Sequence, residues 1–115
     1  MYLDNIVAFY QLQKLIIQLY VGFNDLTIMS NKTVTEIELS CYNPNGAHSQ
    51  LSLKGIENFP QLESLTISRA NLNVDTILKA TNHKIKKLRF HNCIGINMSE
   101  LQTYCQMNNI DLLKE

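Results

Sequence analysis

Apolar residues recur along this chain in a short fixed pattern, in which one apolar residue is followed by two others at the third and fifth positions after it. The pattern occurs at Leu12-Leu15-Ile17, Val34-Ile37-Leu39, Leu62-Leu65-Ile67 and Ile85-Leu88-Phe90, and it begins again at Ile110-Leu113. Its starts are 22, 28, 23 and 25 residues apart. Such a period indicates a repeat protein in which each repeat contains one strand and a returning segment.

The alternation within each repeat is that of a strand buried on one face. Side chains along a strand point alternately to its two sides, and no single strand can bury its own apolar side. We therefore expect the strands to stack in parallel and in register. One ladder should join Leu15, Ile37, Leu65, Leu88 and Leu113, and a second should join Ile17, Leu39, Ile67 and Phe90. At about 1.5–3 kcal/mol for each fully buried Leu, Ile or Phe, these ladders are expected to be the main stabilising interaction.

The segments between the strands carry two helix signals and one turn signal. Asn97, followed three residues later by Glu100, indicates a helix start, with an apolar stripe at Met98, Leu101, Tyr104 and Cys105. A less regular helix is predicted after Asn73 or Asp75, with a stripe at Val74, Ile77 and Leu78. In the longest repeat, Asn43-Pro44-Asn45-Gly46 predicts a turn and a surface loop to Gln50. The core is then expected to resume at Leu51, Leu53, Ile56 and Phe59.

The first 21 residues allow two interpretations. A helical stripe at Leu3, Ile6, Val7 and Tyr10 is compatible with a helix that continues through Ile17. We favour the alternative, in which the helix ends near Tyr10 and a strand lies near Leu15 to Leu19. In both cases residues 1–11 are expected to cap the N-terminal end of the stack.

The last complete repeat adds Cys93, Ile96, Leu101 and Cys105 to the strand pattern before Ile110. It is similar to the cysteine-containing leucine-rich repeat, LxxLxLxxCxxI followed by a helix that often ends in Cys. That subtype is best known from F-box leucine-rich-repeat proteins, which are substrate receptors of ubiquitin ligases, and from related intracellular adaptors. The resemblance implies an α/β fold, a short leucine-rich-repeat solenoid with a parallel concave sheet and short convex helices.

The resemblance is good over one repeat, fair over residues 62–84 and loose before Val34. Tyr42 and Ala70 stand where the pattern has Cys or Asn after the strand, and residues 1–11 are too short for an F-box. The resemblance therefore implies a fold and a binding role, without membership of a ubiquitin ligase.

Length and cysteine content limit the classes of protein to which this chain can belong. The 115 residues suit one domain, residues 1–115, with about four to five repeats. No apolar run approaches the roughly 18 residues of a membrane span, and the N-terminus lacks the features of a secretory signal. The odd count of 3 cysteines leaves at least one free thiol, which favours a cytoplasmic or nuclear protein.

The outward strand positions carry the expected partner-binding site. They are acidic in the second strand, small and hydroxylated in the third and basic in the fourth, and Leu112 and Lys114 are expected to continue them in the fifth. Concave solenoid faces bind partners, so we interpret this face as a bipolar groove for a protein or peptide; a solvated sheet face is the alternative. The expected site residues are Lys14, Glu36, Glu38, Ser64, Thr66, Ser68, Lys87, Arg89 and His91.

Other functions find less support. A basic run at His83, Lys84, Lys86, Lys87, Arg89 and His91 could contact phosphates, but the sequence pI near 6.8 and the absence of stacking aromatics on the face disfavour nucleic acid. Cys93 and Cys105 lack the paired spacing of a zinc site. Phosphate-binding glycine loops and nucleophile elbows are missing from the sequence. We therefore expect neither an enzyme nor a metal or cofactor site.

The C-terminal strand suggests a second class of function. The sequence stops at Leu112-Leu113-Lys114-Glu115, with no following helix to cover the apolar side chains. An unpaired strand beside exposed apolar residues favours association. The alternative hypothesis is a structural or assembly protein that associates through its open ends, as a homo-oligomer or as a subunit of a larger complex.

Overall fold

The fold is α/β, with a parallel sheet covered on one side. A computed structural model describes residues 12–19, 26–27, 29–44, 46–73, 77 and 85–114. The elements, in chain order, are β1 (Lys14–Leu19), β2 (Glu36–Cys41), β3 (Ser49–Gln50), the 3-10 helix η1 (Ile56–Asn58), β4 (Ser64–Ser68), β5 (Ala70–Asn71), β6 (Lys87–His91), α3 (Met98–Met107) and β7 (Asp111–Lys114).

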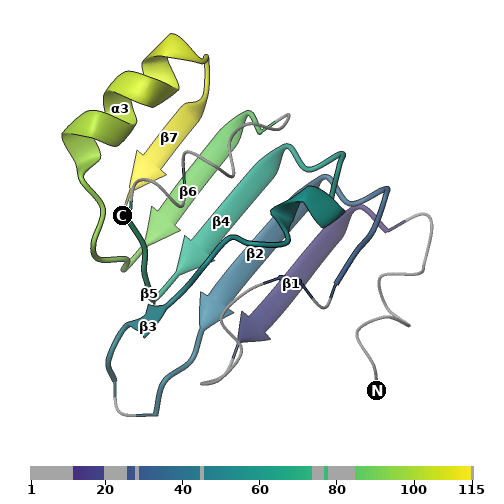
Figure 1. Ribbon diagram of the computed structural model, residues 1–115, viewed down its shortest axis with the longest axis horizontal. Coiled ribbons are helices and arrows are strands. Elements are labelled where there is room, and N and C mark those ends of the chain that lie inside the picture. Colours follow the sequence, from purple (N-terminus) through teal and green to yellow (C-terminus); the bar gives the residue numbers. More distant parts are fainter. Residues whose placement is uncertain are drawn as a thin grey trace.

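The main sheet has five parallel strands in the order β1-β2-β4-β6-β7, which is their order along the chain (Figure 1). The predicted parallel neighbours at residues 34–39, 62–67 and 85–90 are confirmed, as is a strand near Leu15 to Leu19. Lys14 pairs with Glu36, Glu36 with Ser64, Ser64 with Lys87 and Lys87 with Asp111, at separations of 22, 28, 23 and 24 residues.

The buried ladders form the core of the sheet. Leu15, Ile37, Leu65 and Leu88 are buried side by side, as are Ile17, Leu39, Ile67 and Phe90. Strict alternation fixes this register, because a slip of one residue would move every apolar side chain to the other face. The two predicted ladders are therefore confirmed for the first four strands.

The fifth strand has the opposite alternation from the one we predicted. Leu112 pairs with Leu88 and is half-buried, whereas Leu113 pairs with Arg89 and is 41% exposed. The prediction that Leu113 joins the ladder and that Leu112 and Lys114 face outward is therefore wrong. The buried residues Val34, Leu62 and Ile85 lie two positions ahead of β2, β4 and β6, but Ile110 lies directly before β7. Losing one residue reverses the alternation, and two adjacent leucines fit either phase.

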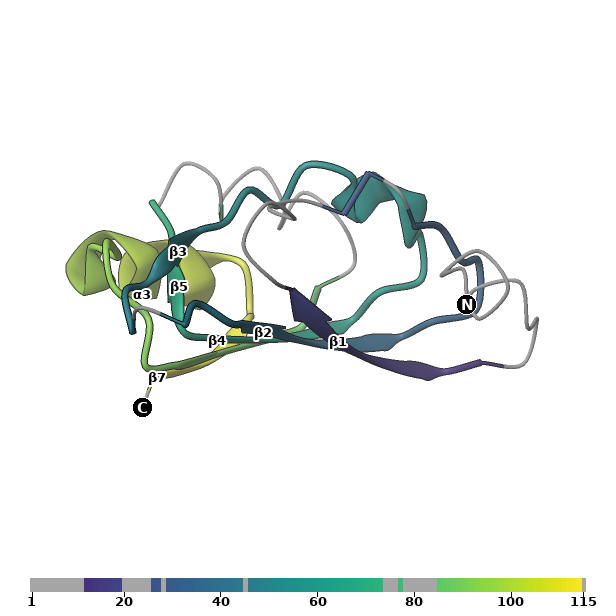
Figure 2. The ribbon, with the colours of Figure 1, turned by 90° about the horizontal axis from the view of Figure 1, so that it is seen from below.

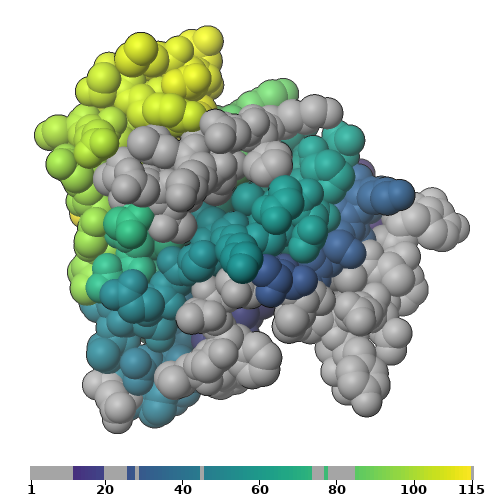
Figure 3. Space-filling view, viewed as in Figure 1, coloured from purple at the N-terminus to yellow at the C-terminus, as the bar shows by residue number. Residues whose placement is uncertain are grey.

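The second layer lies on one side of the sheet. Figure 2 shows α3, β3, β5 and η1 on that side, and none of the described elements lies on the opposite side of the strands. In the space-filling view of that side, the segment between β2 and β4 faces the viewer across the middle of the molecule, and α3 lies at one end of it (Figure 3). The layer therefore leaves the outward strand positions uncovered.

The predicted C-terminal helix is confirmed as α3. The side chain of Asn97 accepts a hydrogen bond from the backbone N–H of Glu100 at 3.3 Å, and Leu101 and Cys105 are buried. Of the other predicted helix, Ile77 is buried, while Val74, Asp75 and Leu78 lie outside the described residues. The predicted capping segment 1–11 also lies outside them.

The long repeat between β2 and β4 is more ordered than predicted. Gly46 donates its N–H to the carbonyl of Asn43 at 3.0 Å, which closes the predicted turn. The predicted loop to Gln50 includes β3, which pairs in parallel with β5. Leu51, Leu53, Ile56 and Phe59 are buried, as predicted.

Candidate functional site: a groove across the open sheet face

The open sheet face is built from side chains that the strand register aligns in three rows. The rows are Lys14, Glu36, Ser64, Lys87 and Asp111; Ile16, Glu38, Thr66, Arg89 and Leu113; and Gln18, Ser40, Ser68 and His91. All nine residues that the sequence places in a partner-binding site lie in these rows. The fold therefore brings them to one face of one sheet.

A central groove of about 460 Å³ runs along β4 on this face. Ser64 and Thr66 form its floor, because their side chains are short. Glu36 and Glu38 of β2 line one side, and Lys87 and Arg89 of β6 line the other. Since neighbouring strands lie about 4.8 Å apart, the two sides are about 10 Å apart.

A second hollow of about 350 Å³ shares Glu38, Thr66 and Arg89 with the central groove. Its lining also includes Ile16 of β1 and Leu113 of β7. Ile16 is 69% exposed and Leu113 41% exposed, so the face carries an apolar side chain on each edge strand. Such side chains can anchor a partner that crosses the polar centre.

Lys14 partly neutralises the acidic side of the groove. Its Nζ lies 3.2 Å from Oε2 of Glu36 and 3.3 Å from Oε1 of Glu38. The hydrogen bond to Glu36, followed by that to Glu38, raises the pKa of Lys14. One ammonium shared by two carboxylates leaves this part of the face with a single net negative charge.

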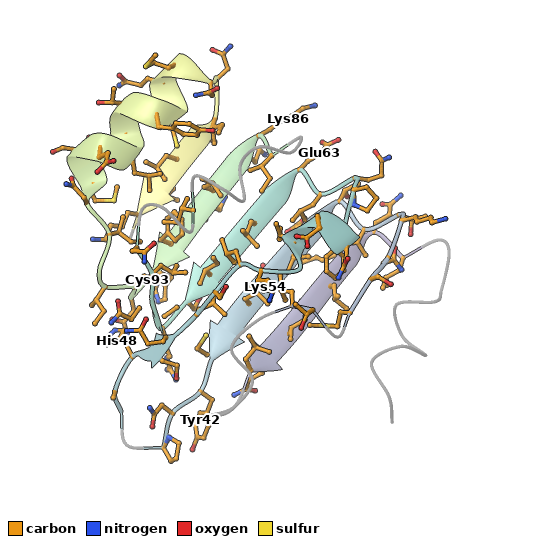
Figure 4. The ribbon with its side chains drawn as sticks, viewed as in Figure 1. Tyr42, His48, Lys54, Glu63, Lys86 and Cys93 are labelled. Carbon is orange, nitrogen blue, oxygen red and sulfur yellow. The ribbon has the colours of Figure 1, made fainter. Side chains whose placement is uncertain are left out.

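A second ion pair lies where β4 and β6 begin. Nζ of Lys86 is 3.8 Å from Oε1 of Glu63, and both side chains are substantially exposed (Figure 4). Each residue directly precedes its strand. The pair is neutral and lies at one end of the groove, whose lining includes both residues.

The remaining charges of the groove are the cations of β6. In the described part of the chain, neither Lys87 nor Arg89 has a carboxylate within the 4.0 Å of an ion pair. On β7, Asp111 is the cross-strand neighbour of Lys87, and Leu113 is the cross-strand neighbour of Arg89. The two sides of the groove therefore differ. Lys14 pairs with the acidic side, whereas the basic side is open to a ligand.

The basic run does not form one patch. Lys87, Arg89 and His91 alternate onto the open face, whereas Lys86 contacts Glu63 ahead of β6. His83 and Lys84 lie outside the described residues. The described residues of the run thus divide among the central groove, its end and the second hollow, which His91 lines.

The cysteines serve the core. Cys41, Cys93 and Cys105 are buried free thiols. Burial raises the pKa of each thiol, and backbone hydrogen bonds partly offset this effect for Cys93. No group of three or more His, Cys, Asp or Glu side chains among the described residues is arranged to hold a metal ion.

The chain matches no protein-family model, and comparisons with curated proteins and with solved structures found no match. Among the described residues, no helix is both long and apolar enough to cross a membrane. The functional interpretation therefore depends on the geometry of the open sheet face.

Several residues of the face were missed from the sequence. Glu63 and Lys86 occupy the same position of successive repeats, directly before the strand, and a comparison of equal repeat positions would have predicted their contact. Asp111 and Leu113 were missed because the phase of β7 was misjudged. Between adjacent Leu112 and Leu113 the pattern offers no signal that favours one phase.

Proposed function

We propose that this chain is a protein-interaction module that binds a peptide or protein surface in the central groove. The observation that carries the proposal is the groove itself. Acidic and basic strands border a floor of small hydroxyl side chains, on the face that the second layer leaves open. Charged groups arranged in this way steer the approach of a partner and fix its register.

The regular repeat supports a leucine-rich-repeat solenoid as the setting of this groove. Parallel strands repeat every 22–28 residues, within the roughly 20–29 residue period of that architecture. We propose a cytoplasmic or nuclear adaptor or substrate-recognition piece with no enzymatic activity. From β1 to β7 the face spans four strand spacings, about 19 Å, enough for about six residues of extended peptide.

A steric variant tests the site without assuming the charge of the partner. Thr66→Trp fills the floor of the groove, and an aromatic residue is tolerated in a strand. Gln102→Trp on the exposed side of α3 is the matched control. Tagged wild-type and variant proteins are compared in pull-downs from native lysate with mass spectrometry, after circular dichroism has verified the fold of each.

Partners of the groove should be captured by the wild type and by Gln102→Trp but not by Thr66→Trp. If Thr66→Trp captures the same proteins in the same amounts, the groove is not their binding site.

The edge strand β7 supports a second function, assembly with another copy or another subunit. β7 lies at the edge of the described sheet, with Leu113 exposed. An edge strand presents backbone groups that can pair with another chain.

Sedimentation at micromolar concentration should then show a dimer or larger species that Leu113→Lys abolishes. Met107→Lys, at an exposed apolar residue of α3, is the control, and a wild-type monomer at every concentration would exclude self-assembly.

A further inference from the structure

Four side chains on β4 and β6 form a compact set of hydrogen-bond donors. Ser64 pairs with Lys87 and Thr66 pairs with Arg89. Residues two apart on one strand point to the same face about 6.6 Å apart, and neighbouring strands lie about 4.8 Å apart. We call these four residues the donor patch. Two hydroxyls and two cations thus stand at the corners of a small rectangle.

The donor patch matches the chemistry of a carboxylate. Lys and Arg only donate hydrogen bonds, and a carboxylate only accepts them, at about four lone-pair sites. Hydrogen bonds between such ionised groups are stronger than neutral ones. Ser64, Thr66 and Arg89 are half-buried, so a carboxylate bound there would be partly shielded from water.

The three carboxylates that line the central groove pair with lysines outside the donor patch. Glu36 and Glu38 lie on the far side of β4 and contact Lys14 on the next strand outward. Glu63 contacts Lys86 at the end of the groove. Asp111 of β7 is the cross-strand neighbour of Lys87 and could compete with a bound carboxylate, but no ion pair joins it to Lys87 in the described structure. The protein thus neutralises much of its acidic side while leaving the donor patch open.

We infer that the partner of the central groove is an acidic protein segment, with an Asp or Glu carboxylate on the donor patch. This inference rests on the proposed function. The net negative charge left around Lys14, Glu36 and Glu38 orients the segment, so that its acidic residue lies over β6 and a neutral or basic residue lies over β2. The two sites are about 10 Å apart, about three residues of extended chain.

The same carboxylates disfavour a nucleic acid in this groove. A polyanion carries a phosphate at every nucleotide, and a strand lying along or across the groove would meet Glu36, Glu38 and Glu63. A peptide can confine its acidic residues to one end. The groove therefore suits a ligand whose charge changes along its length.

A titration of the isotope-labelled protein with defined peptides tests the ligand class. Three blocked ten-residue Gly-Ser peptides carry two Glu, two Gln or two Lys at matched positions, and a ten-nucleotide single-stranded DNA is the fourth probe. At low salt the Glu peptide should shift the amide signals of β4 and β6 and bind about tenfold more tightly than the Gln peptide, the effect of one charge-assisted hydrogen bond. Salt should weaken this binding.

The inference is wrong if the Gln or Lys peptide binds as tightly as the Glu peptide, if none binds at millimolar concentration, or if the DNA binds more tightly than any of them.

Charge reversal with a matched control locates the binding site. Lys87→Glu with Arg89→Glu changes the net charge as much as Lys32→Glu with Lys54→Glu, whose lysines are exposed and do not line the groove. The first pair should abolish binding of the Glu peptide and promote that of the Lys peptide, whereas the second should leave both nearly unchanged. If the two double variants change peptide binding equally, binding depends only on the net charge of the protein, which would contradict the donor patch.

The two proposals can fail separately. If Thr66→Trp abolishes the binding of a cellular partner but charge reversal of Lys87 and Arg89 does not, the acidic ligand is overturned and the groove remains the binding site. Glu-peptide binding that survives Thr66→Trp would overturn the acidic ligand, and unchanged capture of the cellular partners by Thr66→Trp would overturn the groove as well.

Discussion

At the scale of single residues, the buried thiols differ in what surrounds their sulfur atoms. Sγ of Cys93 lies 3.3 Å from the carbonyl oxygen of Ile67 and 3.6 Å from that of His91. Either carbonyl could accept a hydrogen bond from a serine hydroxyl at this position. In the described part of the chain, Cys105 has no such contact.

Serine substitutions should therefore differ in their cost. Cys105→Ser should lower the free energy of unfolding by about 1–3 kcal/mol, the penalty for burying an unpaired hydroxyl. Cys93→Ser should lower it by less, because its hydroxyl can donate to the carbonyl of Ile67. Urea unfolding monitored by circular dichroism measures both. A larger loss for Cys93→Ser would show that the carbonyls do not serve the hydroxyl.

The thiols also predict a dependence of stability on pH. Burial raises the pKa of Cys41, Cys93 and Cys105 above their ordinary value of 9.0, so the folded state retains protons that the unfolded state releases. This stabilisation is complete below pH 9 and is lost as the pH rises through the raised values. The free energy of unfolding should therefore fall as the pH rises above 9, and less steeply when the three cysteines are replaced by alanine. Parallel slopes would contradict this origin.

At the scale of elements, the approach to η1 depends on a glycine. Gly55 has φ of 94°, and a Cβ atom there would lie 2.6 Å from the carbonyl carbon of Leu26 and from the backbone nitrogen of Thr27. Gly46 also has a positive φ, 77°, but an added Cβ would meet nothing within 4 Å. The two glycines thus separate backbone strain from collision with a neighbouring segment.

Alanine at these glycines should separate the two effects. Gly46→Ala adds only the strain of a left-handed residue, about 1–2 kcal/mol. Gly55→Ala adds the collision as well, for a further loss of about 1–3 kcal/mol. Thermal or urea unfolding of the two variants gives the difference, and equal losses would mean that the segment at Leu26 moves aside freely.

The same scale shows how far the sequence predicts this protein. Strands β2, β4 and β6 alternate strictly between apolar and polar residues, and β1 departs from the alternation only at Ile16, so their existence, order and buried faces follow from the pattern. Strands β3 (Ser49–Gln50) and β5 (Ala70–Asn71) have two residues each, and only Ala70 is apolar and buried. Strands this short show no alternation, so their pairing depends on tertiary position. The pattern placed Lys14 on the open face, but its contacts with Glu36 and Glu38 depend on side-chain conformations that the alternation does not specify.

At the scale of the whole molecule, strand position predicts a gradient of local stability. β4 has a partner on both sides, whereas β1 and β7 are edges of the described sheet. Segments with fewer buried contacts open with lower free energy. Native-state hydrogen exchange should therefore be slowest in β4 and faster in β1 and β7. Protection of β7 equal to that of β4 would show that its outer edge is paired in solution and would favour assembly over a free end.

The coincidence of strand order with chain order also bears on how the protein is made. Each strand pairs with the one completed 22–28 residues before it. At about 5–20 residues per second, translation delivers a new strand roughly every 1–6 s, and its neighbour in the sheet has already been synthesised. The nascent chain can therefore build the described sheet from β1 to β7, and at every stage the newest strand is one of its two edges and the one that a chaperone would meet as it emerges.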